Sequence, residues 1–261
     1  MSPLLRHPAA GRQLQRITAR DAGWSHVGFE VMRLAAGETF ERDGDVHNEL
    51  CLVIVEGFGV LEGGGLATGR TGRETPFDPT PDCLYLPPRT LFKVTAETTL
   101  ELAICAAPAT GRLPARIIAA GENAELVRGT GTNTRIVRNI MPEDAPGEQL
   151  LVVEVVTPGG HWSSYPPHKH DTASETETYL EESYYHRLRL GRGFAVQRVY
   201  TDDLSLDETL AVGDRDVVLV PRGYHPVGAP HGFDLYYLNV MAGPVRAWKF
   251  TMAPEHAHLP Y

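Results

Sequence analysis

Short runs of Val, Leu, Ile and Tyr, separated by clusters of Gly, Pro and Asp, recur along the whole chain, and almost no segment keeps a 3.6-residue apolar period. Short apolar runs bounded by turn residues are typical of β-strands. The pattern therefore predicts an all-β fold, a sandwich or a barrel. The strands expected in the first half are residues 28–34, 50–55, 59–61, 83–86, 92–94 and 100–106. Those expected in the second half are residues 150–156, 183–188, 194–200, 216–220 and 235–240.

The stretch 108–133 is rich in Gly, Pro and Thr and interrupts this pattern. It predicts a connection between two domains, residues 1–120 and residues 121–261. The two halves also resemble each other, because each has a strand that ends in proline, before Pro87 and before Pro221. This similarity suggests one β fold used twice.

Composition excludes several classes of partner. A net charge of -9 leaves no basic stripe to neutralise a phosphate backbone, so we expect no nucleic acid. No apolar run approaches the ~20 residues that span a bilayer, and the N-terminus lacks an apolar signal core, so we expect no membrane and a cytoplasmic protein. The three cysteines show no CxxC spacing and are expected to be buried, reduced thiols.

Histidine is concentrated in the second half, where eight of the 11 lie beyond residue 160. His168 and His170 sit at positions i and i+2, so in an extended segment both imidazoles project from the same face. Pro166 and Pro167 directly before them stiffen the backbone and lower the entropy cost of presenting two ligands.

Two further groups complete a candidate metal site. Glu182 is the last member of a Glu-rich run and opens an expected strand, while His225 follows a strand and a Pro-x-Gly-x-His turn. Three histidines and one carboxylate suit a borderline divalent ion such as zinc, iron, nickel or manganese, and leave positions open for a substrate. A lone His-x-His is more often a pair of exposed polar side chains, so the prediction depends on all four residues together. Three glutamates of the run, Glu175, Glu177 and Glu181, are expected to be solvated, and His186 and His231 to be pocket or surface residues.

The order His-x-His, Glu, Pro-x-Gly-x-His resembles the two cupin motifs. The longer blocks that contain it are similar to the 5-deoxy-glucuronate isomerase family of myo-inositol catabolism. These blocks are WSSYPPHKHD (162–171), LEESYYHR (180–187), QRVYTDD (197–203), VLVPRGYHPV (218–227) and DLYYLNVMAGP (234–244). They span nearly all of residues 150–250, whereas the first half resembles the family only loosely.

The resemblance implies a bicupin, that is, two cupin-type double-stranded β-helix (jelly-roll) domains. It implies one divalent ion per chain, held by His168, His170, His225 and a glutamate. The common cupin spacing after His-x-His would choose Glu175, and alignment on the strand chooses Glu182. We prefer Glu182, because a rigid strand fixes a ligand better than a Thr/Ser-rich loop does.

The implied reaction converts 5-deoxy-glucuronate, an aldose acid, into its ketose isomer 2-deoxy-5-keto-gluconate. The ion would act as a Lewis acid and stabilise an enediolate. A base must carry the proton, and the candidates are Tyr184, Lys169 and Tyr237. The substrate carboxylate needs a cation, for which Arg198 or Arg222 is a candidate.

Two other functions use the same residues. One is a non-haem iron cupin dioxygenase, which would consume oxygen. The other is a sugar-acid-binding cupin without turnover. The first half has no histidine after Pro87 and Pro88 and is expected to be metal-free. Because cupins of this kind associate through strand edges, a homo-oligomer is compatible with the resemblance, and the number of subunits stays open.

Overall fold

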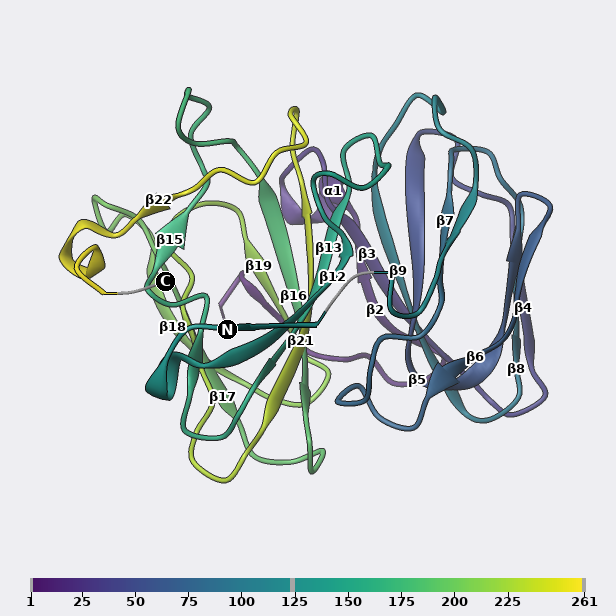
Figure 1. Cartoon of the computed structure of the whole chain (residues 1–261), viewed down its shortest axis with the longest axis horizontal. Coiled ribbons are helices and arrows are strands. Elements are labelled where there is room, and N and C mark those ends of the chain that lie inside the picture. The colour runs from purple at the N-terminus through teal and green to yellow at the C-terminus, as the bar shows by residue number, and fades with distance from the viewer. Residues whose placement is uncertain (1, 123–124, 260–261) are drawn as a thin grey trace. The chain divides into compact units, whose positions relative to one another are not determined.

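The computed structural model describes residues 2–122 and 125–259, and nearly all of its regular structure is β-strand (Figure 1). Packing divides the chain into two compact units. The N-terminal unit begins at Ala9 and also takes in Ile140–Val152. The C-terminal unit takes in Glu125–Asn139, the described residues from Val153 onward, and the start of the chain through Pro8. The domain division expected after residue 120 stays a prediction. Among the described residues, no helix is long and apolar enough to cross a membrane.

The N-terminal unit is built from one curled antiparallel sheet. Its elements are β2 (Gln13–Ile17), α1 (Ala19–Ala22), β3 (Gly28–Leu34), β4 (Thr39–Arg42), β5 (Asn48–Gly63), β6 (Leu66–Arg73), β7 (Cys83–Leu86), β8 (Phe92–Ala96), β9 (Leu100–Pro108) and β10 (Arg116–Ile118). The strands follow the order β10-β7-β5-β9-β3-β2, and β4, β6 and β8 extend the sheet from β5. Leucine, isoleucine, valine and phenylalanine side chains fill the space that the sheet encloses.

The C-terminal unit carries three sheets among its described residues. Its elements are β1 (Leu5–Arg6), β11 (Glu125–Arg128), η1 (Gly131–Asn133), β12 (Arg135–Met141), β13 (Leu151–Thr157), β14 (Trp162–Ser163), β15 (His168–Lys169), β16 (Glu181–Leu188), β17 (Ala195–Tyr200), β18 (Asp207–Val212), β19 (Val217–Val220), β20 (Val227–Gly228), β21 (Leu235–Ala242), β22 (Thr251–Met252) and η2 (Pro254–His256). The sheets run β1-β19-β16-β21-β13-β12-β11, β14-β20-β17-β18 and β15-β22.

Most expected strands are present, and residues 28–34 and 83–86 coincide with β3 and β7. The prediction of two strands at 50–55 and 59–61 is wrong, because β5 is continuous through Gly57. There the register against β9 shifts and the strand changes partners to β6 and β8. Gly57 has φ 91°, so the strand bends at this residue and does not end. The expected connection at 108–133 also contains paired strands, β10 and β11.

Candidate active site

Strand alternation on β16 and β21 places polar side chains on one buried face. Glu182 and Tyr184 are two residues apart on β16, and their partners across the ladder are Met241 and Asn239 on β21. Side chains two residues apart on a strand lie on the same face, so these four point together. All four are almost completely buried, which makes this face the floor of an enclosed site.

Three histidines converge on the same region. His168 lies on β15, His170 follows it, and His225 lies in the turn between β19 and β20. All three are buried, and one nitrogen from each lies within 4.8 Å of the others. The Nδ1 atom of His225 lies 2.9 Å from the carbonyl oxygen of Gly223, and a hydrogen bond there leaves its Nε2 lone pair directed inward.

Glu182 has its two carboxylate oxygens in different surroundings. Oε2 accepts hydrogen bonds from the Tyr184 hydroxyl at 2.8 Å and from the Asn239 amide at 2.9 Å. Oε1 lies 2.5 Å from His170 Nε2 and 3.2 Å from His225 Nε2. The Glu182 carboxylate is thus fixed from one side and directed at the histidines from the other.

The inward-facing atoms have no hydrogen-bond partner of acceptable geometry among the described residues. This holds for His170 Nε2, His225 Nε2 and Glu182 Oε1, all buried. Buried polar atoms without a partner are costly, and a cation at their common point would satisfy all of them. Two imidazoles and a carboxylate with His168 nearby fit a divalent ion of borderline softness.

The protonation states match ligand roles. Burial, and then the neighbouring His225 and His170, lowers the pKa of His168 well below its ordinary value. Burial also lowers the pKa of His225. Burial alone would raise the pKa of Glu182, but His170 and His225 outweigh it and the pKa falls. For His170, Glu182 outweighs burial and raises the pKa. Glu182 is therefore ionised, and two of the imidazoles are neutral.

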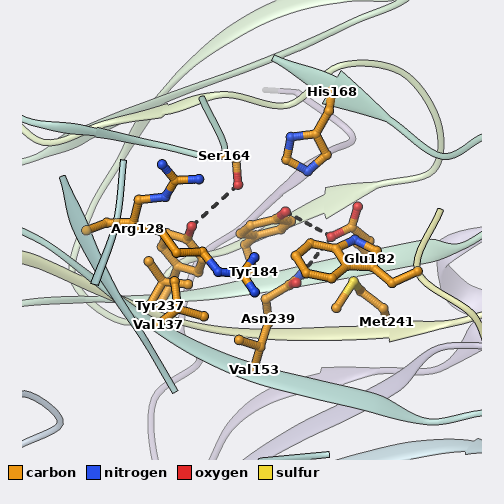
Figure 2. A pocket seen from close by; sticks show the side chains of 13 residues that line it. Arg128, Val137, Val153, Ser164, His168, Glu182, Tyr184, Tyr237, Asn239 and Met241 are labelled. Carbon is orange, nitrogen blue, oxygen red and sulfur yellow. Dashed lines mark hydrogen bonds between the residues drawn. The ribbon is translucent and has the colours of Figure 1, made fainter. Parts of the chain in front are cut away.

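A pocket adjoins this cluster (Figure 2). His168 and Glu182 lie toward one end, Arg128 and Tyr237 toward the other, and Ser164 and Tyr184 between them. The pocket is partly open, and its volume of about 30 Å³ has room for roughly one water molecule. A six-carbon acid therefore enters only when lining side chains move.

The structure separates the three candidate bases. Tyr184 and Tyr237 line the pocket, with ring centroids 5.1 Å apart, and the Tyr237 hydroxyl lies 3.4 Å from the Ser164 hydroxyl. Lys169 does not line the pocket, and its ammonium group lies 2.6 Å from Asp202. Because Lys169 is adjacent to His168 on β15, the two side chains point to opposite faces.

Neither predicted substrate-binding arginine lines the pocket. Arg198 is held by Asp207 through two hydrogen bonds of 2.7 and 3.0 Å on the protein surface. Arg222 is exposed and lies 3.4 Å from the Ser205 hydroxyl. The arginines that do line the pocket are Arg128, from the expected connection at 108–133, and Arg135, at the start of β12. Only the pairing of β11 with β12 reveals them.

The glutamates of the acidic run differ from one another. Glu175 is exposed, as expected. The expectation of solvation is wrong for Glu177 and Glu181, which are buried. Glu177 accepts hydrogen bonds from the backbone of Asp171 and Thr172, and so it fixes the loop that follows His170.

Two β units with curled antiparallel sheets, one of them enclosing converged histidines and a glutamate, define a bicupin with a candidate metal centre. The chain belongs to the KduI/IolB family, whose model matches residues 4–259.

Relatives and solved structures agree with this assignment. The chain is 50% identical to a 5-deoxy-glucuronate isomerase of Geobacillus thermodenitrificans, over 92% of this chain and 89% of that one. It is 43% identical to the enzyme of the same name from Bacillus subtilis, over 98% of each chain. An IolB-like protein from Salmonella typhimurium superposes with a TM-score of 0.94 at 50% identity, covering 97% of this chain and 98% of that one. A Bacillus subtilis oxalate decarboxylase has a TM-score of 0.64 at 12% identity, covering 94% and 77%, and shares the fold alone.

Proposed function

We propose that this chain is a metal-dependent isomerase that converts the aldose acid 5-deoxy-glucuronate into the ketose acid 2-deoxy-5-keto-gluconate. The observation that carries the proposal is the near full-length identity of 50% and 43% to relatives named 5-deoxy-glucuronate isomerase. The enclosed polar site in the C-terminal unit supports it, because such a reaction needs a positioned acid and base shielded from water.

His168, His170, Glu182 and His225 would hold one divalent ion, which is zinc, manganese, iron or nickel. The convergence of the three histidines, and the unpartnered His170 Nε2, His225 Nε2 and Glu182 Oε1, support this ligand set over one that uses exposed Glu175. When bound, the ion would supply Lewis-acid stabilisation of negative charge on the substrate oxygens.

The chain's own hydroxyl groups would handle the proton that moves between adjacent carbons. Burial, and then Glu182, raises the pKa of Tyr184 well above its ordinary value, so its phenol stays protonated and keeps donating to Glu182. Tyr237 is then the better candidate for carrying the proton, because it lines the pocket and its hydroxyl lies 3.4 Å from the Ser164 hydroxyl. Burial alone would lower the pKa of Lys169, but its partners Asp202 and Asp171 outweigh it and raise the pKa, so this residue stays charged and is set aside as the base.

A proton NMR time course of 5-deoxy-glucuronate in deuterated buffer tests the function. We expect the ketose acid to form at equal rates with and without oxygen, with no redox cofactor, and chelation to stop the reaction. Transfer through a base should also place solvent deuterium in the product, whereas a hydride shift would not. A requirement for oxygen, or normal turnover by folded His225→Ala protein, would refute the proposal.

Elemental analysis tests the metal separately. We expect close to one divalent ion per chain in the purified protein, and none in a variant that combines His168→Ala with His170→Ala. Full occupancy in that variant would exclude the proposed ligand set.

A further inference from the structure

Two arginines face each other at the pocket wall. Arg128 on β11 and Arg135 on β12 are direct partners across the antiparallel ladder, and both line the pocket. Like charges directly opposite each other destabilise a sheet. Glu182 is the single carboxylate among the lining residues, and it lies with the histidines. An anion beside the Arg128 guanidinium would therefore reduce the repulsion between the two opposite arginines.

Arg128 has its hydrogen-bond donors available. Its side chain is half-buried and lies over the Trp248 ring at 5.5 Å, and among the described residues it forms no hydrogen bond or ion pair. Its neighbours differ: Arg138 on β12 is paired with Glu125 at 2.8 Å. A guanidinium held only by an aromatic contact can rotate at small cost and present two parallel N–H groups to a carboxylate.

The arrangement of the pocket gives a direction to a bound molecule. In Figure 2, Arg128 and Tyr237 lie toward one end and Glu182 toward the other, with Ser164 and Tyr184 between them. A sugar acid has the same polarity, with a carboxylate at one end and the reacting carbonyl at the other. We infer that Arg128, assisted by Arg135, forms the subsite that binds the carboxylate of the substrate and places the carbonyl end beside Glu182 and His168. This inference rests on the proposed function.

The subsite also accounts for the small cavity. The volume of about 30 Å³ is too small for a six-carbon acid. Arg128 is half-buried, whereas Arg135 is 2% exposed and its Nη1 donates to the carbonyl oxygen of Asn133. Arg128 is thus the member of the pair that moves, and Arg135 supplies fixed charge.

Kinetics of the metal-loaded enzyme with two substrates test the subsite. The substrates are 5-deoxy-glucuronate and its neutral amide, 5-deoxy-glucuronamide. Because a charged hydrogen bond contributes at least a factor of about ten in affinity, Arg128→Gln should raise KM for the acid at least about tenfold. The preference for acid over amide should fall by a similar factor, with kcat and metal content nearly unchanged. Arg128→Lys should restore part of the preference, since lysine keeps the positive charge but lacks the two parallel N–H groups of the guanidinium.

A control variant and a binding measurement separate the possible failures. Arg189→Gln removes an exposed arginine that pairs with Asp234 away from the pocket, and it should leave KM unchanged. Calorimetric titration of the chelated protein with acid and amide measures binding without turnover. If wild type isomerises the acid and Arg128→Gln retains its KM and its preference, the subsite is refuted alone. If wild type binds the acid through Arg128 but does not isomerise it, the proposed function is refuted and the anion subsite stands.

Discussion

The two carboxylate oxygens of Glu182 lie in different environments. Tyr184 and Asn239 donate to one carboxylate oxygen, and the other oxygen faces His170 and His225. Donors behind a ligand fix its orientation and strengthen its interaction with a cation. The carboxylate is therefore positioned before an ion binds, and that lowers the entropy cost of binding.

Exchanging single glutamates for glutamine distinguishes the two carboxylates that the sequence left open. Glu182→Gln should weaken metal retention by at least about 100-fold, because it removes the negatively charged ligand from a buried cluster. Glu175→Gln should have no effect, because Glu175 is exposed. Metal content after dialysis against a series of chelator concentrations measures both. The opposite ranking would show that the common cupin spacing was the correct guide.

His186 lies on the same face of β16 as Tyr184, with the two ring centroids 6.3 Å apart, and its pKa leads to a prediction about stability. Burial lowers this pKa to about 4, against the opposing effect of its hydrogen bond with Gln197. Between about pH 6.5 and pH 4 the unfolded chain therefore binds a proton that the folded chain excludes. The free energy of unfolding should fall by up to about 3 kcal/mol as the pH drops through this range.

Urea unfolding of chelated protein at pH 7 and pH 4.5 checks this prediction. His186→Gln removes the titrating group, so the loss of stability on acidification should be smaller in the variant than in wild type. Equal losses in the two proteins would show that His186 does not contribute to the pH dependence.

At the scale of elements, strand alternation made part of the site predictable. The His-x-His spacing, the strand beginning near Glu182 and the turn before His225 are all visible in the sequence, and the structure brings these side chains together. Tyr184 follows from the same alternation. The arginine pair was not predictable, because the register of β11 against β12 decides which of several arginines are opposite each other. Arg198 and Arg222 looked equally suitable in sequence, and only their positions on the surface separate them from Arg128.

The continuity of β5 was missed for a related reason. A glycine within apolar residues indicates either a turn or a bend within a strand, and the choice depends on partners far away in sequence. Strand β5 exchanges its neighbours at Gly57, and β6 and β8 continue its pairing. Local pattern identifies strands well and their pairing poorly.

Glu49 shows how one side chain ties a distant segment to β5. It is completely buried, accepts hydrogen bonds from the backbone of Glu148, Gln149 and Leu150 at 2.7–3.2 Å, and receives the Tyr85 hydroxyl at 2.6 Å. The segment that contains these amides packs with the N-terminal unit, as these hydrogen bonds to Glu49 require. A negative charge surrounded by donors is well compensated even without water.

Glu49→Gln should lower the free energy of unfolding by about 2–4 kcal/mol. The side-chain NH2 of glutamine would face the backbone N–H groups and the Tyr85 hydroxyl, which are themselves donors. Thermal and urea unfolding measure the loss. Glu41→Gln on β4 is the matched control, since Glu41 is exposed, and it should leave stability within about 0.5 kcal/mol of wild type. Equal effects of the two substitutions would mean that the buried carboxylate is not a structural anchor.

At the scale of the whole molecule, the candidate chemistry lies in one unit. The histidines, Glu182 and the arginine pair all belong to the C-terminal unit. The N-terminal unit is built around an apolar core of leucine, isoleucine, valine and phenylalanine side chains. Because each unit has its own buried interior, a ligand held by one of them should stabilise that unit in particular.

Metal removal should therefore change hydrogen exchange in only part of the chain. Without the ion, the inward-facing atoms of His170, His225 and Glu182 lose their common partner, and the stabilisation that binding adds to the folded state disappears. Amides of β16 and β19 should exchange at least about tenfold faster after chelation, whereas those of β5 and β9 should change by less than about twofold. Mass spectrometry of deuterium uptake measures both regions in one experiment. The variant with His168→Ala and His170→Ala provides the control, since chelator should not alter its exchange. If β5 and β9 responded as strongly as β16 and β19, the ion would be stabilising the molecule as one cooperative body and not the unit that holds its ligands.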